Sequence, residues 1–132
     1  MKKFKIFDQE RKKWVYFTLS DLVNINPEST FGDSCFLMQR FEYDYSDEDV
    51  CEFTGFYAMG EEVYENDIVE IFVPDETGEF LNEEHGLVMK DEDNACWVIK
   101  NPKTGKMIDI NANYYVIGNI IEDPDFFERV EQ

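Results

Sequence analysis

The sequence predicts a mainly β (α+β) protein with a small C-terminal β-barrel, an N-terminal lobe made of a hairpin and a short helix, and a short C-terminal helix. Aromatic residues make up 16% of the 132 residues and apolar residues 43%, which is enough material for a folded core. Short apolar runs separated by turn residues fill the C-terminal part. Because closing a small sheet removes its exposed edges, such a series of strands favours a closed or half-closed barrel.

Two parts are expected within this single domain. Residues 1–52 form an N-terminal hairpin and an acidic segment packed on the barrel, and residues 53–132 form the barrel with its C-terminal helical turn. In the first part, alternation over 4–6 and 14–17 predicts the two strands of the hairpin. Thr18 or Ser20 is the expected cap of a short helix over 21–23, and the apolar run 35–38 predicts a buried strand.

The barrel strands are expected at 68–73, 86–89, 97–99, 107–110 and 114–121, with turns at 54–55 and at Gly60. Asp123 and Pro124 predict the start of the final helix, because Asp is a good cap and Pro suits the first helical position. Phe126, Phe127 and Val130 would dock this helix on the barrel.

The charge is the most unusual property of the chain. It has 30 acidic and 12 basic residues, a formal charge of −18. Such a charge disfavours phosphate backbones and anionic membrane surfaces as partners. It either keeps the protein soluble or forms a face for a basic partner. The candidate face is the basic-free segment 42–52, read as an exposed loop or edge, with the candidate partner-binding residues Glu42, Tyr43, Asp44, Tyr45, Asp47, Glu48, Asp49 and Glu52.

The cysteines and the N-terminus predict a cytoplasmic protein. Cys35, Cys51 and Cys96 are an odd number without a Cys-x-x-Cys pair, which is typical of reduced thiols in the cytosol. No apolar run follows the basic N-terminus, so we expect neither a signal peptide nor a membrane anchor.

Two stretches resemble a known family. The first, 53–69, begins Phe-Thr-Gly and ends Val-Tyr-Glu-Asn-Asp-Ile-Val, and the second, 115–124, reads Tyr-Val-Ile-Gly-Asn-Ile-Ile-Glu-Asp-Pro. This pattern is similar to that of the YopX family of small bacterial, phage and prophage proteins, whose first hairpin the segment 4–16 also resembles. Residues 18–52 are matched least. The resemblance implies an SH3-like C-terminal barrel and a bacterial host, and it implies no established activity.

The residues of these motifs are interpreted as specifying the fold rather than a site. Gly55 and Gly60 permit positive φ in turns, and Asn66, where the family usually has Gly, also tolerates a left-handed backbone. Asp67 caps the turn before its strand, and Gly118 allows a close approach or a bulge, which Asn119 can bridge by bonding to the backbone. The full set of fold-specifying residues is Thr54, Gly55, Gly60, Tyr64, Asn66, Asp67, Gly118 and Asn119.

Residues that point to catalysis are scarce, and we expect no enzyme. His85 is the single histidine, so every nucleophile–base pair would have to include it. Neither a nucleophile elbow nor a glycine-rich phosphate loop occurs. The acidic residues 91–93 lack the remaining ligands of a calcium loop. We therefore predict no catalytic residue, no metal and no cofactor.

The leading hypothesis is a phage- or prophage-type accessory protein that binds an unknown, basic or nucleic-acid-binding protein through segment 42–52 and the loop 75–84. A specific version of it is mimicry of nucleic acid by regularly spaced carboxylates. One alternative is a nucleic-acid-associated SH3-like module that uses the turn from Lys100 to Lys106, although direct binding of nucleic acid is disfavoured by the charge. Another is a self-assembling structural protein, a homo-oligomer paired through acidic and basic regions.

Overall fold

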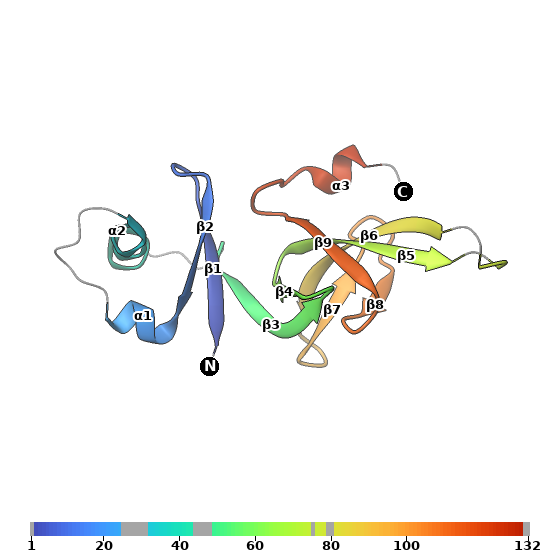
Figure 1. Cartoon of the computed structure of the whole chain (residues 1–132), viewed down its shortest axis with the longest axis horizontal. Helices are drawn as coiled ribbons and strands as arrows, with labels where there is room; N and C mark the ends of the chain where they lie inside the picture. The colour runs from blue at the N-terminus through green and yellow to red at the C-terminus, as the bar shows by residue number, and fades with distance from the viewer. Residues whose placement is uncertain (1, 25–31, 44–48, 75, 79–80, 131–132) are drawn as a thin grey trace. The chain divides into compact units, whose positions relative to one another are not determined.

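The computed structural model describes residues 2–24, 32–43, 49–74, 76–78 and 81–130. The chain divides into two compact units, Met1–Phe53 (unit 1) and Thr54–Gln132 (unit 2), drawn in Figure 1. Each unit has a hydrophobic core of its own. The predicted fold class is confirmed, because the described residues are mainly β, the sheets curl into a half-barrel, and a short helix lies near the C-terminus.

The N-terminal hairpin of unit 1 forms as predicted. Strands β1 (Lys3–Asp8) and β2 (Lys13–Thr18) pair antiparallel from Lys3 opposite Thr18 to Asp8 opposite Lys13. This register puts Ile6 and Val15 on one face, where both are almost fully buried. Because side chains alternate along a strand, that face is the one available to the helices of the unit.

Helix α1 (Leu19–Val23) confirms the predicted helix and shows which residue caps it. The Thr18 hydroxyl accepts a hydrogen bond from the backbone N–H of Asp21 at 3.3 Å, and the Asp21 carboxylate accepts one from the Thr18 N–H at 2.8 Å. This reciprocal capping box satisfies backbone donors at the helix start. Thr18, rather than Ser20, is therefore the cap.

The predicted strand at 35–38 is wrong. These residues belong to helix α2 (Gly32–Met38), which continues into a short π-helix, η1 (Gln39–Tyr43). Leu37 and Phe41, four residues apart, pack on the hairpin face with Phe36. A spacing of four places side chains on one face of a helix. A run of four apolar residues does not distinguish a buried strand from a buried helix, which is why the prediction failed.

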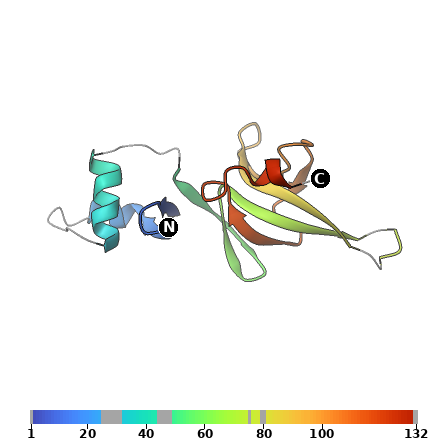
Figure 2. The same cartoon turned by 90° about the horizontal axis from the view of Figure 1, so that it is seen from above.

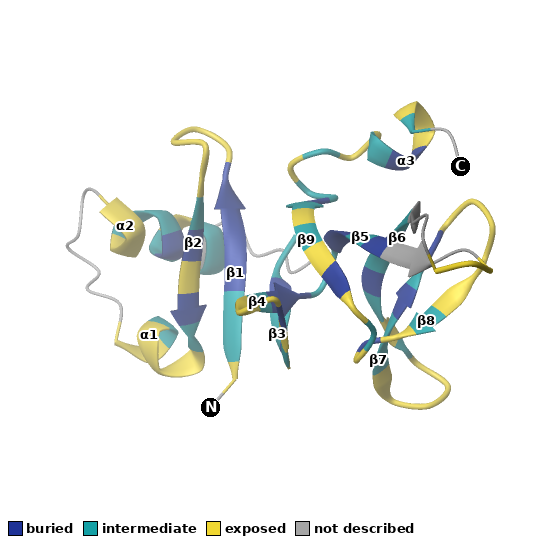
Figure 3. Ribbon diagram, turned by 45° about the vertical axis from the view of Figure 1, so that its right-hand side comes forward, coloured by how far each residue is buried: buried dark blue, intermediate teal, exposed yellow. Residues whose placement is uncertain are grey.

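Strand β3 (Cys51–Ala58) begins in unit 1, where Cys51 and Glu52 pair with β1, and continues in unit 2 beside β4 (Glu61–Tyr64). The other strands of unit 2 form an antiparallel five-stranded sheet in the order β8-β7-β6-β5-β9. They are β5 (Asp67–Pro74), β6 (Leu81–Asp91), β7 (Cys96–Lys100), β8 (Met107–Asp109) and β9 (Tyr114–Asn119). Val63, Val69, Val88 and Ile99, each at most 1% exposed, belong to its core. Buried parts of the strands of unit 2 are dark blue in Figure 3.

Three predicted details of unit 2 are corrected. Thr54 and Gly55 lie inside strand β3 rather than in a turn, and β9 ends at Asn119 instead of 121. Helix α3 (Phe126–Arg129) begins later than predicted, after Asp125, whose side chain makes no capping bond. The carboxylate of Asp123 is instead held by the Arg129 guanidinium, at 2.6 and 2.7 Å. An acid bound by its own helix in this way does not act as the expected cap.

Candidate functional site

The motif residues Tyr64, Asp67 and Asn119 meet at the buried start of β5. Asp67 and Asn119 are each 1% exposed. One Asp67 carboxylate oxygen accepts a hydrogen bond from the Tyr64 N–H at 2.8 Å, and the other accepts one from the Asn119 side-chain amide at 2.9 Å. The Asn119 carbonyl oxygen accepts the Ile121 N–H at 2.9 Å. The predicted roles of Asp67 and Asn119 in bonding the backbone are confirmed, because each closes a turn.

Asn66 has the left-handed backbone that was predicted, with φ of 70°. Its N–H donates to the Val88 carbonyl at 2.8 Å and its carbonyl accepts the Ile120 N–H at 2.9 Å. This single turn residue therefore connects the end of β4 to β6 and to the segment after β9. Thr54 has a comparable role within β3, since its hydroxyl donates to the Val63 carbonyl at 2.7 Å.

Gly118 allows a bulge and not a close approach. It pairs with Ile68, while Val116 pairs with the next residue, Val69, so that β9 has one extra residue at this point. A Cβ atom on Gly118 would lie 4.0 Å from the Ile68 side chain, an ordinary contact. The close approach is at Gly86, where a Cβ would meet Cγ2 of Ile99 at 2.3 Å. Sequence reasoning missed Gly86, which follows no turn signal.

The candidate partner-binding residues of 42–52 do not form one continuous loop. The backbones of Glu42 and Tyr43 belong to η1, whereas Glu52 lies in β3, with its carboxylate 3.2 Å from the Lys2 ammonium. Asp49 forms an ion pair with Arg40. The other members, Asp44, Tyr45, Asp47 and Glu48, lie outside the described residues. Although the segment itself contains no basic residue, the fold brings Arg40 to Asp49 and Lys2 to Glu52, both in its last four residues.

A groove of about 740 Å³ lies in unit 1 between the β1–β2 turn and the helical segment. The turn contributes Phe7 to Arg11, α2 contributes Gly32, Cys35 and Phe36, η1 contributes Gln39 and Arg40, and Asp49 completes the lining. Charged side chains of both signs therefore face the same space.

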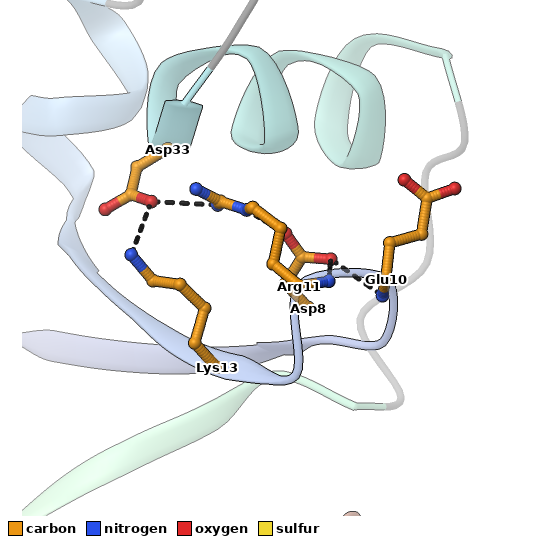
Figure 4. A network of polar contacts seen from close by, with 5 residues as sticks. All are labelled: Asp8, Glu10, Arg11, Lys13 and Asp33. Atoms are coloured by element: carbon orange, nitrogen blue, oxygen red, sulfur yellow. Dashed lines mark hydrogen bonds and ion pairs between the residues drawn. The ribbon is translucent and has the colours of Figure 1, made fainter.

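One wall of the groove is held by the polar network drawn in Figure 4. Arg11 binds the carboxylates of Asp8 and Asp33, the second at 2.8 Å, and Lys13 also contacts Asp33, at 3.2 Å. The Asp8 carboxylate additionally accepts the backbone N–H groups of Glu10 at 3.0 Å and Arg11 at 3.2 Å. The network therefore connects two parts of the lining that are distant in sequence, the hairpin turn and the start of α2.

This network changes the acidity of its carboxyl groups. Burial by itself raises the pKa of Asp8, but the hydrogen bonds from Arg11 and the turn N–H groups outweigh it, so the pKa lies below its ordinary value. The same balance, with Arg11 and Lys13 as donors, lowers the pKa of Asp33. Both carboxylates stay ionised at neutral pH. An anionic ligand would have to displace them from Arg11, so the groove is not a ready anion site.

Outside the groove, few side chains of the described residues could act in catalysis or metal binding. Among the described residues, no three His, Cys, Asp or Glu side chains are grouped so that they could hold a metal ion. His85 lies in β6, with its ring centroid 5.3 Å from that of Phe126 on α3. The thiol of Cys51 is buried, that of Cys35 is half-buried and that of Cys96 is exposed. In the described ranges no helix has the length and apolar character needed to cross a membrane.

The Lys100–Lys106 turn, the candidate nucleic-acid contact, is built around Asn101. The Asn101 side chain accepts the N–H groups of Lys103 at 2.9 Å and Thr104 at 3.2 Å, and donates to the His85 carbonyl at 3.1 Å. The Lys103 ammonium donates to the Val130 carbonyl at 3.2 Å, while that of Lys106 lies 2.8 Å from the Glu84 carboxylate. Two of the three lysines therefore already have partners within unit 2.

The stretch of chain that is acidic and lacks basic residues is much longer than the segment 42–52. Residues 41–89 contain 16 acidic residues and no Lys or Arg. Unit 1 has 11 acidic and 7 basic residues, a formal charge of −4, whereas unit 2 has 19 and 5, a formal charge of −14. Most of the charge therefore belongs to the half-barrel. The positions of Lys and Arg along the whole chain define this run, whereas the local density of acidic residues points only to its densest part, the segment 42–52.

Comparison with known proteins supports the identification made from the motifs. No curated protein and no solved structure matches the chain. The family described as YopX protein matches residues 3–128, which include the hairpin, the buried Asp67–Asn119 pair and most of helix α3. With nearly its whole length matched, this chain belongs to the YopX family.

Proposed function

We propose that this YopX-family protein is a non-enzymatic accessory protein of a bacterial or prophage system that binds the basic surface of another protein through unit 2. The observation that carries the proposal is the run 41–89, which has no Lys or Arg and has 16 acidic residues, 10 of them in unit 2. It includes β3, β4, β5 and most of β6. A protein partner with a basic face is the kind that such a surface attracts.

The basic residues of unit 2 do little to neutralise this surface. Arg129 is bound to Asp123 and Asp125, at 2.6 and 2.9 Å, and Lys106 to Glu84. Lys90 lies over the Trp97 ring, 5.2 Å from its centroid. The formal charge of the unit, in which all these basic residues are already counted, is −14. Such a potential accelerates encounter with a basic protein and repels a phosphate backbone.

The experiment is capture of partners from a nuclease-treated bacterial lysate, followed by measurement of Kd for each purified partner. We expect partners with basic surfaces. Their Kd should rise between about 50 mM and about 500 mM salt, because added salt shortens the distance over which exposed charges attract each other. The capture step identifies candidate partners. The salt dependence of Kd and the effect of charge variants then test whether the acidic run binds them.

Two variants with the same change in charge separate the acidic run from total charge. Glu61 and Glu76 are exposed residues within the run, and Glu92 and Glu128 are exposed residues of unit 2 outside it. We expect Glu61→Gln with Glu76→Gln to weaken binding more than Glu92→Gln with Glu128→Gln. Equal effects, a Kd independent of salt, or DNA binding that is lost on changing Lys100, Lys103 and Lys106 would contradict the proposal.

A further inference from the structure

The tip of the β3–β4 hairpin exposes two large side chains within the acidic run. Tyr57 is 62% exposed and Met59 is 66% exposed, while Ala58 between them is buried. Tyr57 is the second-last residue of β3 and Met59 is the first residue of the turn that follows it, so both exposed side chains lie at the same end of the hairpin. The turn is coloured as exposed in Figure 3, and the hairpin, drawn in green, projects from unit 2 in Figure 2.

The backbone at Met59 is unfavourable for that residue. The two residues between the strands, Met59 and Gly60, have φ of 51° and 86°. Two positive φ values in a two-residue loop are typical of a type I′ turn, whose first position favours Asn, Asp or Gly. A methionine in the left-handed region is disfavoured by contact between its Cβ and the backbone. The hairpin therefore keeps a methionine where Asn would suit the fold better.

Comparison with the other turns shows that an exposed apolar side chain at a positive φ is unusual in this protein. Lys12, Asn66 and Ala95 are the other described non-glycine residues with positive φ. Their side chains are charged, amide-bearing and small, whereas Met59 puts a flexible apolar side chain into solvent. Local sequence that conflicts with local backbone is a feature of functional positions. Methionine is also common on surfaces that bind apolar groups of varied shape.

The surroundings of the tip indicate what could cover it. Glu61 is exposed and follows the turn directly, and Glu62 lies next to it. The nearest basic residues in the chain are Arg40 on one side and Lys90 on the other. An apolar contact surrounded by carboxylates is complementary to an apolar patch surrounded by Lys and Arg.

We propose that Tyr57 and Met59 are the apolar anchors of a protein-binding surface, and that their partner is a basic protein segment with an apolar face. This inference rests on the proposed function and adds to it the point of contact. The anchors supply contact area, and the acidic run supplies attraction and orientation.

The test uses two synthetic peptides and the full-length protein. One is a short amphipathic helical peptide of Leu and Lys; the other has every Leu replaced by Ser and therefore the same charge. Binding is measured by fluorescence anisotropy. We expect the Leu/Lys peptide to bind about tenfold more tightly than the Ser/Lys peptide, because burial of one apolar side chain accounts for a factor of that order.

The decisive variant is Met59→Asn, which removes the anchor while improving the turn. We expect it to raise the Tm by about 2–4 °C and to abolish the preference for the Leu/Lys peptide. Tyr57→Ser should reduce the same preference. Met107→Gln is the matched control, since Met107 is 50% exposed on β8, outside the acidic run, and we expect it to leave the preference unchanged.

Each other outcome contradicts a defined part of the reasoning. A Leu/Lys preference that survives in Met59→Asn, or that is lost equally in Met107→Gln, overturns the role of the tip while the proposed function stands. If neither peptide binds the unchanged protein at low salt, the role of the tip is overturned. The attraction to basic partners, on which the proposed function depends, is then overturned as well.

Discussion

The substitution Gly86→Ala tests the core of unit 2 at its closest backbone approach. A Cβ atom on Gly86 would lie 2.3 Å from Cγ2 of Ile99. Carbon atoms pack best at about 3.5–4.0 Å, so the two strands or the Ile99 side chain must move by more than about 1 Å. Ile99 is 1% exposed and β-branched, which leaves it little freedom to turn away.

The expected cost follows from this geometry. Inserting a methyl group into a packed core destabilises a protein by about 1–3 kcal/mol, and we expect the upper part of that range, about 2–3 kcal/mol, at this site. Gly118→Ala is the control, because a Cβ there finds its nearest neighbour at 4.0 Å. We expect that variant to stay within about 0.5 kcal/mol of the unchanged protein.

Urea unfolding followed by tryptophan fluorescence measures the effect. The chain has two tryptophans, Trp14 in unit 1 and Trp97 in unit 2, where Trp97 packs against the core. In a Trp14→Phe background the signal reports unit 2 by itself. With a slope of about 1–3 kcal/mol per molar urea, the midpoint for Gly86→Ala should fall by about 1 M.

A double-mutant cycle identifies the contact. Ile99→Ala should cost about 3 kcal/mol through the cavity it leaves, and adding Gly86→Ala should then cost little, because the clashing methyl group is gone. Additive losses would show that the methyl group added by Gly86→Ala does not clash with the Ile99 side chain, and a loss below about 0.5 kcal/mol for Gly86→Ala would refute the argument from close approach.

Three further predictions concern single residues. Asn66→Ala should destabilise unit 2 by about 1 kcal/mol in urea unfolding, since Ala lacks the tolerance of Asn for φ of 70°; no change would contradict the role of the left-handed turn. Burial raises the pKa of Tyr114 to about 12, from 10.0. Because its folded pKa lies above the unfolded one, the stability it contributes is present below pH 10 and is lost as pH rises toward 12, and Tyr114→Phe should remove that part of an alkaline titration. Asp8 has a lowered pKa, so its contribution is present above the ordinary value of 3.8 and is lost as pH falls through the lower folded value. Arg11→Gln should reduce this acid dependence, read from Trp14 fluorescence, and an unchanged profile would refute the role of Arg11.

Local patterns were sufficient wherever the signal and its partner lie close in sequence. Alternation predicted the first hairpin, and the residue types before α1 limited its cap to Thr18 or Ser20. The tolerance of Asn for a left-handed backbone, at a position where the family usually has Gly, predicted the turn at Asn66. The backbone bonds predicted for Asp67 and Asn119 are present, and both residues are buried. In each case the interaction extends over a few residues or is a property of one residue type.

Predictions failed where a contact with a residue outside the local pattern decides the structure. The run 35–38 is a helix because the hairpin face offers a surface for side chains four residues apart. Thr54 and Gly55 are part of a strand because Val63 accepts the Thr54 hydroxyl. Asp123 does not cap α3 because Arg129 binds it.

The sequence by itself determined the mainly β class, the family and the acidity of this protein, because composition, alternation and short motifs are properties of the chain before it folds. Only the tertiary structure decided where the charge and the exposed apolar groups act. It brought Asp33 to Arg11, paired Arg40 with Asp49 and Lys2 with Glu52 in segment 42–52, and left Met59 exposed at a hairpin tip. The physical reason is that ion pairing and exposure depend on which residues meet through space, and strand pairing joins residues that no local pattern connects.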